Sequence, residues 1–188
     1  ADNNGGNSAT TTTDGDKTDD KTDNKDNADD KKDDGKKDDG GSTEREATKG
    51  LQLTRLADDT YAVIGYKGTD GDVYIPSTYG SAKDPITSIA DGAFTDNYKL
   101  TNVTIGNNLT SVGKNAFKNC RNLKTVTLGT AVKTIGEQAF YGANQLTDVT
   151  FPNGLTSIDG EAFRGCAGLT SVTLTDSVTR VGSTAFQE

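Results

Sequence analysis

A unit of 23 residues recurs four times in this chain, and it constrains the fold more than any other feature. From residue 100 the copies read LTNVTIGNNLTSVGKNAFKNCRN, LKTVTLGTAVKTIGEQAFYGANQ, LTDVTFPNGLTSIDGEAFRGCAG and LTSVTLTDSVTRVGSTAFQE. The aromatic residue of each copy keeps the same register, at Phe117, Phe140, Phe163 and Phe186. No unit of this length can bury its own Leu, Val, Ile and Phe. The repeat therefore predicts a stacked solenoid with one continuous core.

Within each unit the apolar pattern changes its period. Leu123, Val126 and Leu128 alternate with polar residues and predict a short strand. Ala139 and Phe140 begin a segment with helical spacing, which predicts one or two turns of α- or 3₁₀-helix held by packing. We therefore expect an α/β repeat solenoid. Its parallel β-sheet lies on one side with strands ~4.8 Å apart, and the helical turns lie on the other.

The four copies at residues 100–188 follow a divergent first repeat at 73–99. Its strand, Val73-Tyr74-Ile75, lies 30 residues before Val103, so seven extra residues fall in the turn-rich segment PSTYGSAKDP. Residues 51–72 predict an N-terminal hairpin cap that closes the stack. The last copy is incomplete and leaves apolar residues without cover. This end predicts either further repeats or end-to-end self-association of two chains.

Residues 1–50 have a composition unlike the rest and contain no Val, Ile, Leu, Phe, Tyr or Cys. Thirteen Asp and two Glu against eight Lys and one Arg give this arm a charge of −6. Such a segment cannot build a core, so it predicts a disordered Asp/Lys/Thr-rich tether. A calcium loop starting at Asp14 would have Asp19 in place of Gly and Lys25 in place of Glu. We interpret the arm as a solvated spacer, with no metal site.

Several functional classes are excluded by composition. The chain has no His, which removes imidazole bases and most zinc sites. Its pI near 4.6 argues against nucleic acid, and no apolar run is long enough to span a membrane. Carboxylates could in principle form a catalytic dyad, but a flat stacked surface offers no cleft for one. We predict no enzymatic activity and no cofactor. The carboxylates that could in principle supply such a dyad are Asp84, Asp91, Asp148, Asp159 and Glu161.

The two cysteines occupy the same repeat position two units apart. Stacking separates Cys120 and Cys166 by ~10 Å, beyond the ~7 Å Cα limit for a disulfide. Ala143 fills the equivalent position between them, so the site accepts a small apolar side chain. The pattern predicts two buried free thiols without a metal or redox role.

The outward face of the predicted sheet is the place to expect a ligand. Two interpretations of this face stay open. The structural one is that threonine simply suits an exposed strand, and the functional one is that these residues form a flat polar recognition surface. Aromatic residues tend to be interface hot spots, so Tyr74 and Tyr79 would anchor such a surface. The candidate ligand surface comprises Tyr74, Tyr79, Asn102, Thr104, Thr125, Thr127, Asp148, Thr150, Ser171 and Thr173.

The units fit the pattern L-x-x-V-T-[ILF]-x-x-x-[LV]-T-x-[VI]-x-x-x-A-F-x-x-[CA]-x-x, which resembles the BspA-type leucine-rich repeat of surface proteins. The resemblance covers about residues 51–188. It implies a bacterial cell-surface or secreted protein, adhesin-like, that binds an extracellular protein or surface glycan. A lipoprotein or wall anchor upstream of Ala1 would explain the tether. Two alternatives stay open: a structural spacer, and an accessory interaction module of a larger surface protein.

Overall fold

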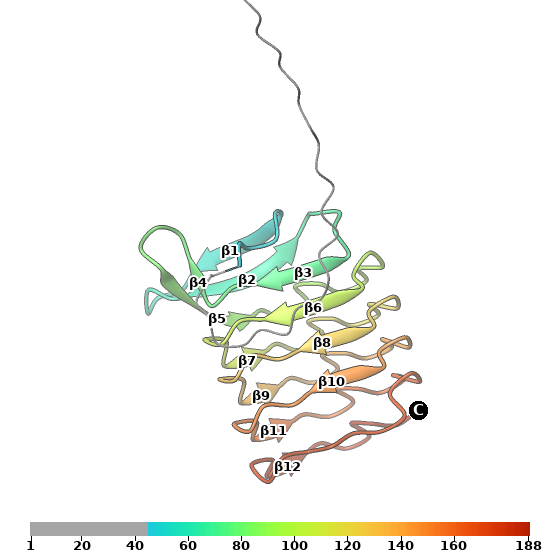
Figure 1. The fold of residues 1–188 in the computed structure, drawn as a ribbon. Coiled ribbons are helices and arrows are strands. Elements are labelled where there is room, and N and C mark those ends of the chain that lie inside the picture. Colours follow the sequence, from blue (N-terminus) through green and yellow to red (C-terminus); the bar gives the residue numbers. More distant parts are fainter. Residues whose placement is uncertain (1–44) are drawn as a thin grey trace, which may run out of the picture. The chain divides into compact units, whose positions relative to one another are not determined.

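The computed structural model describes residues 45–188 as a stack of coils made of short strands and turns (Figure 1). The tether predicted from composition lies outside the described residues except for residues 45–50, and so does the calcium loop considered from Asp14. Twelve strands occur in the described part of the chain. They are β1 (Leu51–Arg55), β2 (Tyr61–Tyr66), β3 (Asp72–Ile75), β4 (Thr78–Tyr79), β5 (Asp84–Ile89), β6 (Asn102–Ile105), β7 (Ser111–Val112), β8 (Thr125–Thr127), β9 (Thr134–Ile135), β10 (Asp148–Thr150), β11 (Ser157–Ile158) and β12 (Arg180–Val181).

The strands form two sheets. The first, which we call the threonine sheet, has the order β10-β8-β6-β3 and is parallel throughout. The second has the order β1-β2-β5-β7-β9-β11-β12 and is parallel from β2 onward. At its start, β1 and β2 form an antiparallel hairpin. The stacked coils and the parallel sheet are confirmed, whereas sequence analysis predicted only the threonine sheet and missed the second one.

The prediction of helical turns was wrong, because residues 45–188 contain no helix. In an α-helix every N–H group donates four residues back along its own chain. In the second repeat, alternate N–H groups instead donate to the next coil: Asn115 to Glu137, Phe117 to Ala139 and Asn119 to Tyr141, at 2.9, 2.7 and 2.7 Å. The groups between them close turns three residues back, from Ala116 to Gly113, Lys118 to Asn115 and Cys120 to Phe117.

Left-handed backbone explains why these turns cannot merge into a helix. Asn115 and Asn119 have φ angles of 56° and 57°, and the same two positions recur as Gln138 and Gly142 in the next coil, at 55° and 70°. A right-handed helix does not accommodate such residues. The Ala-Phe spacing therefore reflects a chain of β-turns that buries its aromatic residue.

The core lies between the two sheets and the turns. Phe94, Phe117, Phe140 and Phe163 are at most 2% exposed, and their rings stack face to face with centroids 4.8 to 5.1 Å apart. Phe186 continues the stack at 5.2 Å from Phe163. This column follows from the 23-residue period, which returns one ring to the same place in every coil.

The threonine sheet ends one coil earlier than the sequence predicted, because residues 171–173 form no strand. In the preceding coils the N–H groups of Lys124 and Thr147 donate to the coil before, at Thr101 and Lys124. The equivalent N–H of Thr170 donates instead to Gly168 in its own coil, at 3.1 Å. The parallel ladder is therefore interrupted at this point.

The last coil exposes part of its apolar surface. Val178 and Phe186 are half-buried, and Val181 is 47% exposed. End-to-end self-association through this coil stays a prediction.

Candidate ligand-binding surface

Two rows of side chains run across the threonine sheet from coil to coil. The parallel register places Tyr74 beside Thr104, Thr104 beside Thr127 and Thr127 beside Thr150. The same register sets the second row, which runs through Asp72, Asn102, Thr125 and Asp148. The structure thus brings eight polar or aromatic side chains into one ordered patch.

The second row is tied together by side-chain hydrogen bonds. The Asn102 amide donates to Asp72 Oδ1 at 2.6 Å, and its own Oδ1 accepts from Thr125 Oγ1 at 2.6 Å. Thr101 Oγ1 also donates to Asp72, at 2.8 Å. These bonds from Asn102 and then Thr101 hold the pKa of Asp72 below its usual value, because they stabilise the carboxylate. This row is pre-ordered, and its polar groups are largely committed to one another.

The first row differs, because the hydroxyl groups of its three threonines are unused. The Oγ1 atoms of Thr104, Thr127 and Thr150 make no hydrogen bond to any of residues 45–188. Thr127 and Thr150 are exposed, and Thr104 is half-buried. Strand spacing in a parallel sheet puts successive members ~4.8 Å apart. The row therefore presents a ladder of hydroxyl donors and acceptors to the outside.

A cavity of about 460 Å³ lies at the β3 end of this ladder. Its walls include the rings of Tyr74 and Tyr79, with Pro76 between them in the chain and Arg45 and Lys83 supplying positive charge. The Arg45 guanidinium lies 5.4 Å from the centre of the Tyr74 ring, a cation–π distance. Tyr74 thus belongs to both the first row and the cavity.

Local pairing builds the two sides of the cavity. The seven-residue insertion forms a small hairpin in which β4 pairs antiparallel with the start of β5, and this carries Tyr79 outward. The Tyr79 ring is 46% exposed and packs against Tyr61 with centroids 4.9 Å apart. On the other side, Thr48 Oγ1 accepts from the Tyr74 N–H at 2.7 Å, and the Thr48 N–H donates to the Tyr74 carbonyl at 3.2 Å. These bonds hold the chain near Arg45 along the edge of β3.

The predicted site residues fall into two groups. The structure brings together eight of them on the threonine sheet and its adjoining cavity: Tyr74, Tyr79, Asn102, Thr104, Thr125, Thr127, Asp148 and Thr150. Ser171 and Thr173 are exposed but lie beyond the last strand of that sheet.

Sequence reasoning missed Arg45, Asp72 and Lys83. Arg45 was assigned to the arm on composition, although it is the only arginine there. Lys83 lies inside the insertion that the repeat comparison had already identified, so the insertion itself was the available signal. Asp72 precedes the strand that supplies Tyr74, and its register with Asn102 could be read from the repeat.

The two cysteines have a structural role. Cys120 and Cys166 are buried free thiols whose Sγ atoms donate to the carbonyls of Phe94 and Phe140, both at 3.1 Å. Burial raises the pKa of each thiol to about 12. Among residues 45–188 no three His, Cys, Asp or Glu side chains gather as metal ligands, and none of this part is a helix able to cross a membrane.

Comparisons with known proteins agree on one fold. A family model for the BspA type leucine rich repeat region matches residues 77–188 in six copies. A leucine rich repeat protein from T. pallidum is 28% identical with a TM-score of 0.71, and the match covers 74% of this chain and 64% of that one. A leucine-rich repeat protein from Bacteroides ovatus is 28% identical with a TM-score of 0.67, covering 74% and 37%.

A third solved structure carries a description of location. It is a leucine rich cell surface protein from Faecalibacterium prausnitzii, 29% identical with a TM-score of 0.50, and the match covers 78% of this chain and 52% of that one. This chain therefore spans less than two thirds of the length of each of these structures. A search of curated protein sequences found no match.

Proposed function

Because this chain belongs to the BspA-type leucine-rich repeat family, we propose that it is a non-enzymatic bacterial surface or secreted protein that binds an extracellular protein or surface glycan. The family's fold is an interaction fold, which supports binding as the activity. The cell-surface description of the Faecalibacterium prausnitzii relative supports the location. An anchor upstream of Ala1 would hold the protein at the envelope.

The observation that carries the proposal is the unused hydroxyl ladder of Thr104, Thr127 and Thr150 leading into an aromatic cavity. A polar group that stays unpaired in the free protein costs nothing while it faces water, and it can pair with a ligand on binding. Tyr74 and Tyr79 supply rigid contact area at the end of the ladder, where Arg45 and Lys83 add charge. The ligand would lie along the ladder and insert one group into the cavity.

Recognition of this kind makes and breaks no covalent bond. The threonine sheet is rigid because its backbone is hydrogen-bonded and its second row is cross-linked through Asn102. A preformed surface loses little conformational entropy when it binds. Specificity would come from the spacing of the hydroxyls and from the shape of the cavity.

The test is a binding screen of the full chain against host matrix proteins, mucins and cell-wall glycans. The variant carries Thr127→Arg and Thr150→Arg, which place two long cations across the ladder. We expect the wild-type chain to bind one ligand saturably, and the double variant to bind it at least about tenfold more weakly.

The matched control is Thr134→Arg. Thr134 is an exposed threonine in β9 of the other sheet, in the same coil as Thr127, so it tests added charge without touching the ladder. Retained binding by the control and lost binding by the double variant support the proposal. Equal binding by all three proteins, with unchanged circular dichroism, refutes a site on the threonine sheet. No binding by the wild type would favour the spacer role.

A further inference from the structure

A second pocket lies outside the threonine sheet, beside the turns that follow Phe117, Phe140 and Phe163. It has a volume of about 420 Å³, and its lining is mainly polar: Asn119, Arg121, Tyr141, Asn144, Arg164 and Glu188, with Gly142 and Gly165. We propose that this pocket binds a carboxylated pyranose, such as a sialic or uronic acid unit of a glycan. The proposal is independent of the site on the threonine sheet.

The hollow arises from a conformational requirement of the repeat. Of the two positions per coil with a positive φ, the second is filled by Asp96 and Asn119 in the earlier coils and by Gly142 and Gly165 in the later ones. Asn and Gly both tolerate this backbone. At Gly142 the Asn119 Oδ1 lies 2.8 Å from where a Cβ would be, whereas a Cβ at Gly165 would meet only the Gly142 backbone at 3.6 Å. The depression therefore opens over Gly165.

The rows beside this floor carry the groups that an acidic sugar requires. Tyr141 and Arg164 occupy one repeat position in successive coils, and Arg121 and Asn144 occupy another. The Tyr141 hydroxyl, the Asn144 amide and the Arg121 guanidinium make no hydrogen bond within residues 45–188. Lys118 Nζ lies over the Tyr141 ring, 5.1 Å from its centre, so a pyranose would stack on the opposite face of this ring. Arginine pairs with a carboxylate through two parallel N–H donors.

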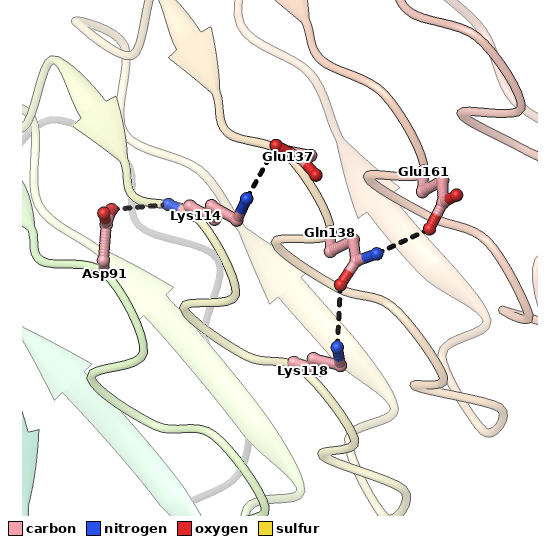
Figure 2. A network of polar contacts seen from close by, with 6 residues as sticks. All are labelled: Asp91, Lys114, Lys118, Glu137, Gln138 and Glu161. Atoms are coloured by element: carbon pink, nitrogen blue, oxygen red, sulfur yellow. Dashed lines mark hydrogen bonds and ion pairs between the residues drawn. The ribbon is translucent and has the colours of Figure 1, made fainter.

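Arg121 and Lys118 are the cations beside the pocket that have no ion pair among residues 45–188. A polar network on the nearby turns neutralises Lys114 with Glu137, whereas Lys118 meets the uncharged amide of Gln138, as Figure 2 shows. In it, Lys114 Nζ donates to Glu137 at 2.9 Å and Lys118 Nζ to Gln138 at 2.7 Å, while the Gln138 amide donates to Glu161 at 2.6 Å. Its members are Asp91, Lys114, Lys118, Glu137, Gln138 and Glu161.

Arg164 joins the same network through one Nη1–Oε1 contact with Glu161 at 3.3 Å. Arg121 has no ion pair among residues 45–188, and its guanidinium lies 6.0 Å from the centre of the Tyr98 ring. The Tyr98 ring is 52% exposed and carries no charge, so this cation–π contact leaves the positive charge of Arg121 in place. A carboxylate that enters the pocket would pair with Arg121, and it would share the pocket with the Glu188 side chain.

The experiment measures binding of the full chain to three soluble sugars by NMR titration. The probes are 3′-sialyllactose, a glucuronic acid–N-acetylglucosamine tetrasaccharide, and lactose as the neutral control. We expect saturable binding of at least one acidic sugar and none of lactose at the same concentration. Whichever acidic sugar binds more tightly identifies the source of the carboxylate.

Two variants locate the site. Arg121→Gln removes the guanidinium charge of Arg121. It should weaken binding about 10- to 100-fold, which corresponds to the free energy of one charge-assisted hydrogen bond. Gly165→Asn fills the floor with the residue that Asn119 already supplies at this position. A Cβ at Gly165 meets only ordinary contacts at 3.6 Å, so the fold should persist while binding is lost. Arg180→Gln, at a residue exposed on β12, is the charge-matched control and should bind normally.

Equal binding of lactose and the acidic sugars would overturn the carboxylate assignment. Absence of binding by any sugar at millimolar concentration, or full binding by both Arg121→Gln and Gly165→Asn, would overturn the pocket itself. Thr127→Arg with Thr150→Arg should leave this binding unchanged, which separates the pocket from the site on the threonine sheet.

Discussion

Phe140 lies at the middle of the aromatic column and should be among the costliest residues to truncate. It is 0% exposed, with Phe117 at 5.1 Å on one face and Phe163 at 5.0 Å on the other. Truncating a buried Phe to Ala usually costs ~3–5 kcal/mol, through lost transfer energy and a residual cavity. The coils on both sides are tied by backbone hydrogen bonds and cannot collapse inward. We expect Phe140→Ala to lower the free energy of unfolding by ~4 kcal/mol.

The assay is urea unfolding of the full chain, followed by far-ultraviolet circular dichroism. With a slope of ~2 kcal/mol per M, the unfolding midpoint should fall by about 2 M. Phe186→Ala is the internal comparison, because Phe186 is half-buried and stacks on one ring only. It should cost about half as much. A loss below ~2 kcal/mol for Phe140→Ala, or equal losses at both positions, would refute the argument that the continuous column stabilises the stack.

Three further predictions concern single groups. Cys120 and Cys166 should resist iodoacetamide at pH 8 in the folded protein and react after unfolding, because burial raises both pKa values to about 12; rapid labelling of the native protein, measured by mass spectrometry, would contradict this. Gly129→Ala should destabilise the protein by more than ~2 kcal/mol in urea unfolding, since the added Cβ would collide with the backbone of the preceding coil. Hydrogen bonds, led by the one from Asn102, lower the pKa of Asp72 in the folded protein, so the Asp72 carboxylate stabilises the fold above its unfolded pKa of ~3.9. This stability is lost as the pH falls through the lowered pKa. The urea midpoint of Asp72→Asn should therefore drop less between pH 7 and pH 2 than that of the wild type.

Periodicity made the stacked architecture predictable. Because the valines of the strands, such as Val103 and Val126, and the phenylalanines, such as Phe117 and Phe140, recur every 23 residues, the coil length, the parallel strands and the buried aromatic column could be inferred from the sequence. The register of Tyr74 with Thr104 also followed from counting residues, even across the insertion.

The turns could not be predicted in the same way. The apolar spacing of Ala139 and Phe140 fits one helical turn, but it does not reveal that alternate N–H groups donate to the next coil. That pattern depends on left-handed residues such as Asn115 and Gln138, and Gln carries little sequence signal for a positive φ. The second sheet was missed for a related reason: its two-residue strands are too short to show alternation.

The cavity was only partly predictable. Tyr74 and Tyr79 could be proposed from their exposure in the sequence pattern, but Arg45 reaches the site through hydrogen bonds between Thr48 and Tyr74. Those bonds join parts of the chain 26 residues apart, outside the repeat. The sequence offers no period from which to infer such a contact.

We propose above that the exposed side of the threonine sheet recognises the ligand. Amide chemical-shift mapping of the full chain, with the protein or glycan found in the binding screen, tests it most directly. We expect the shifts to concentrate in β3, β6, β8 and β10 and around Tyr79, and to disappear in the Thr127→Arg, Thr150→Arg variant. Shifts confined to β7, β9 and β11 of the other sheet would contradict it.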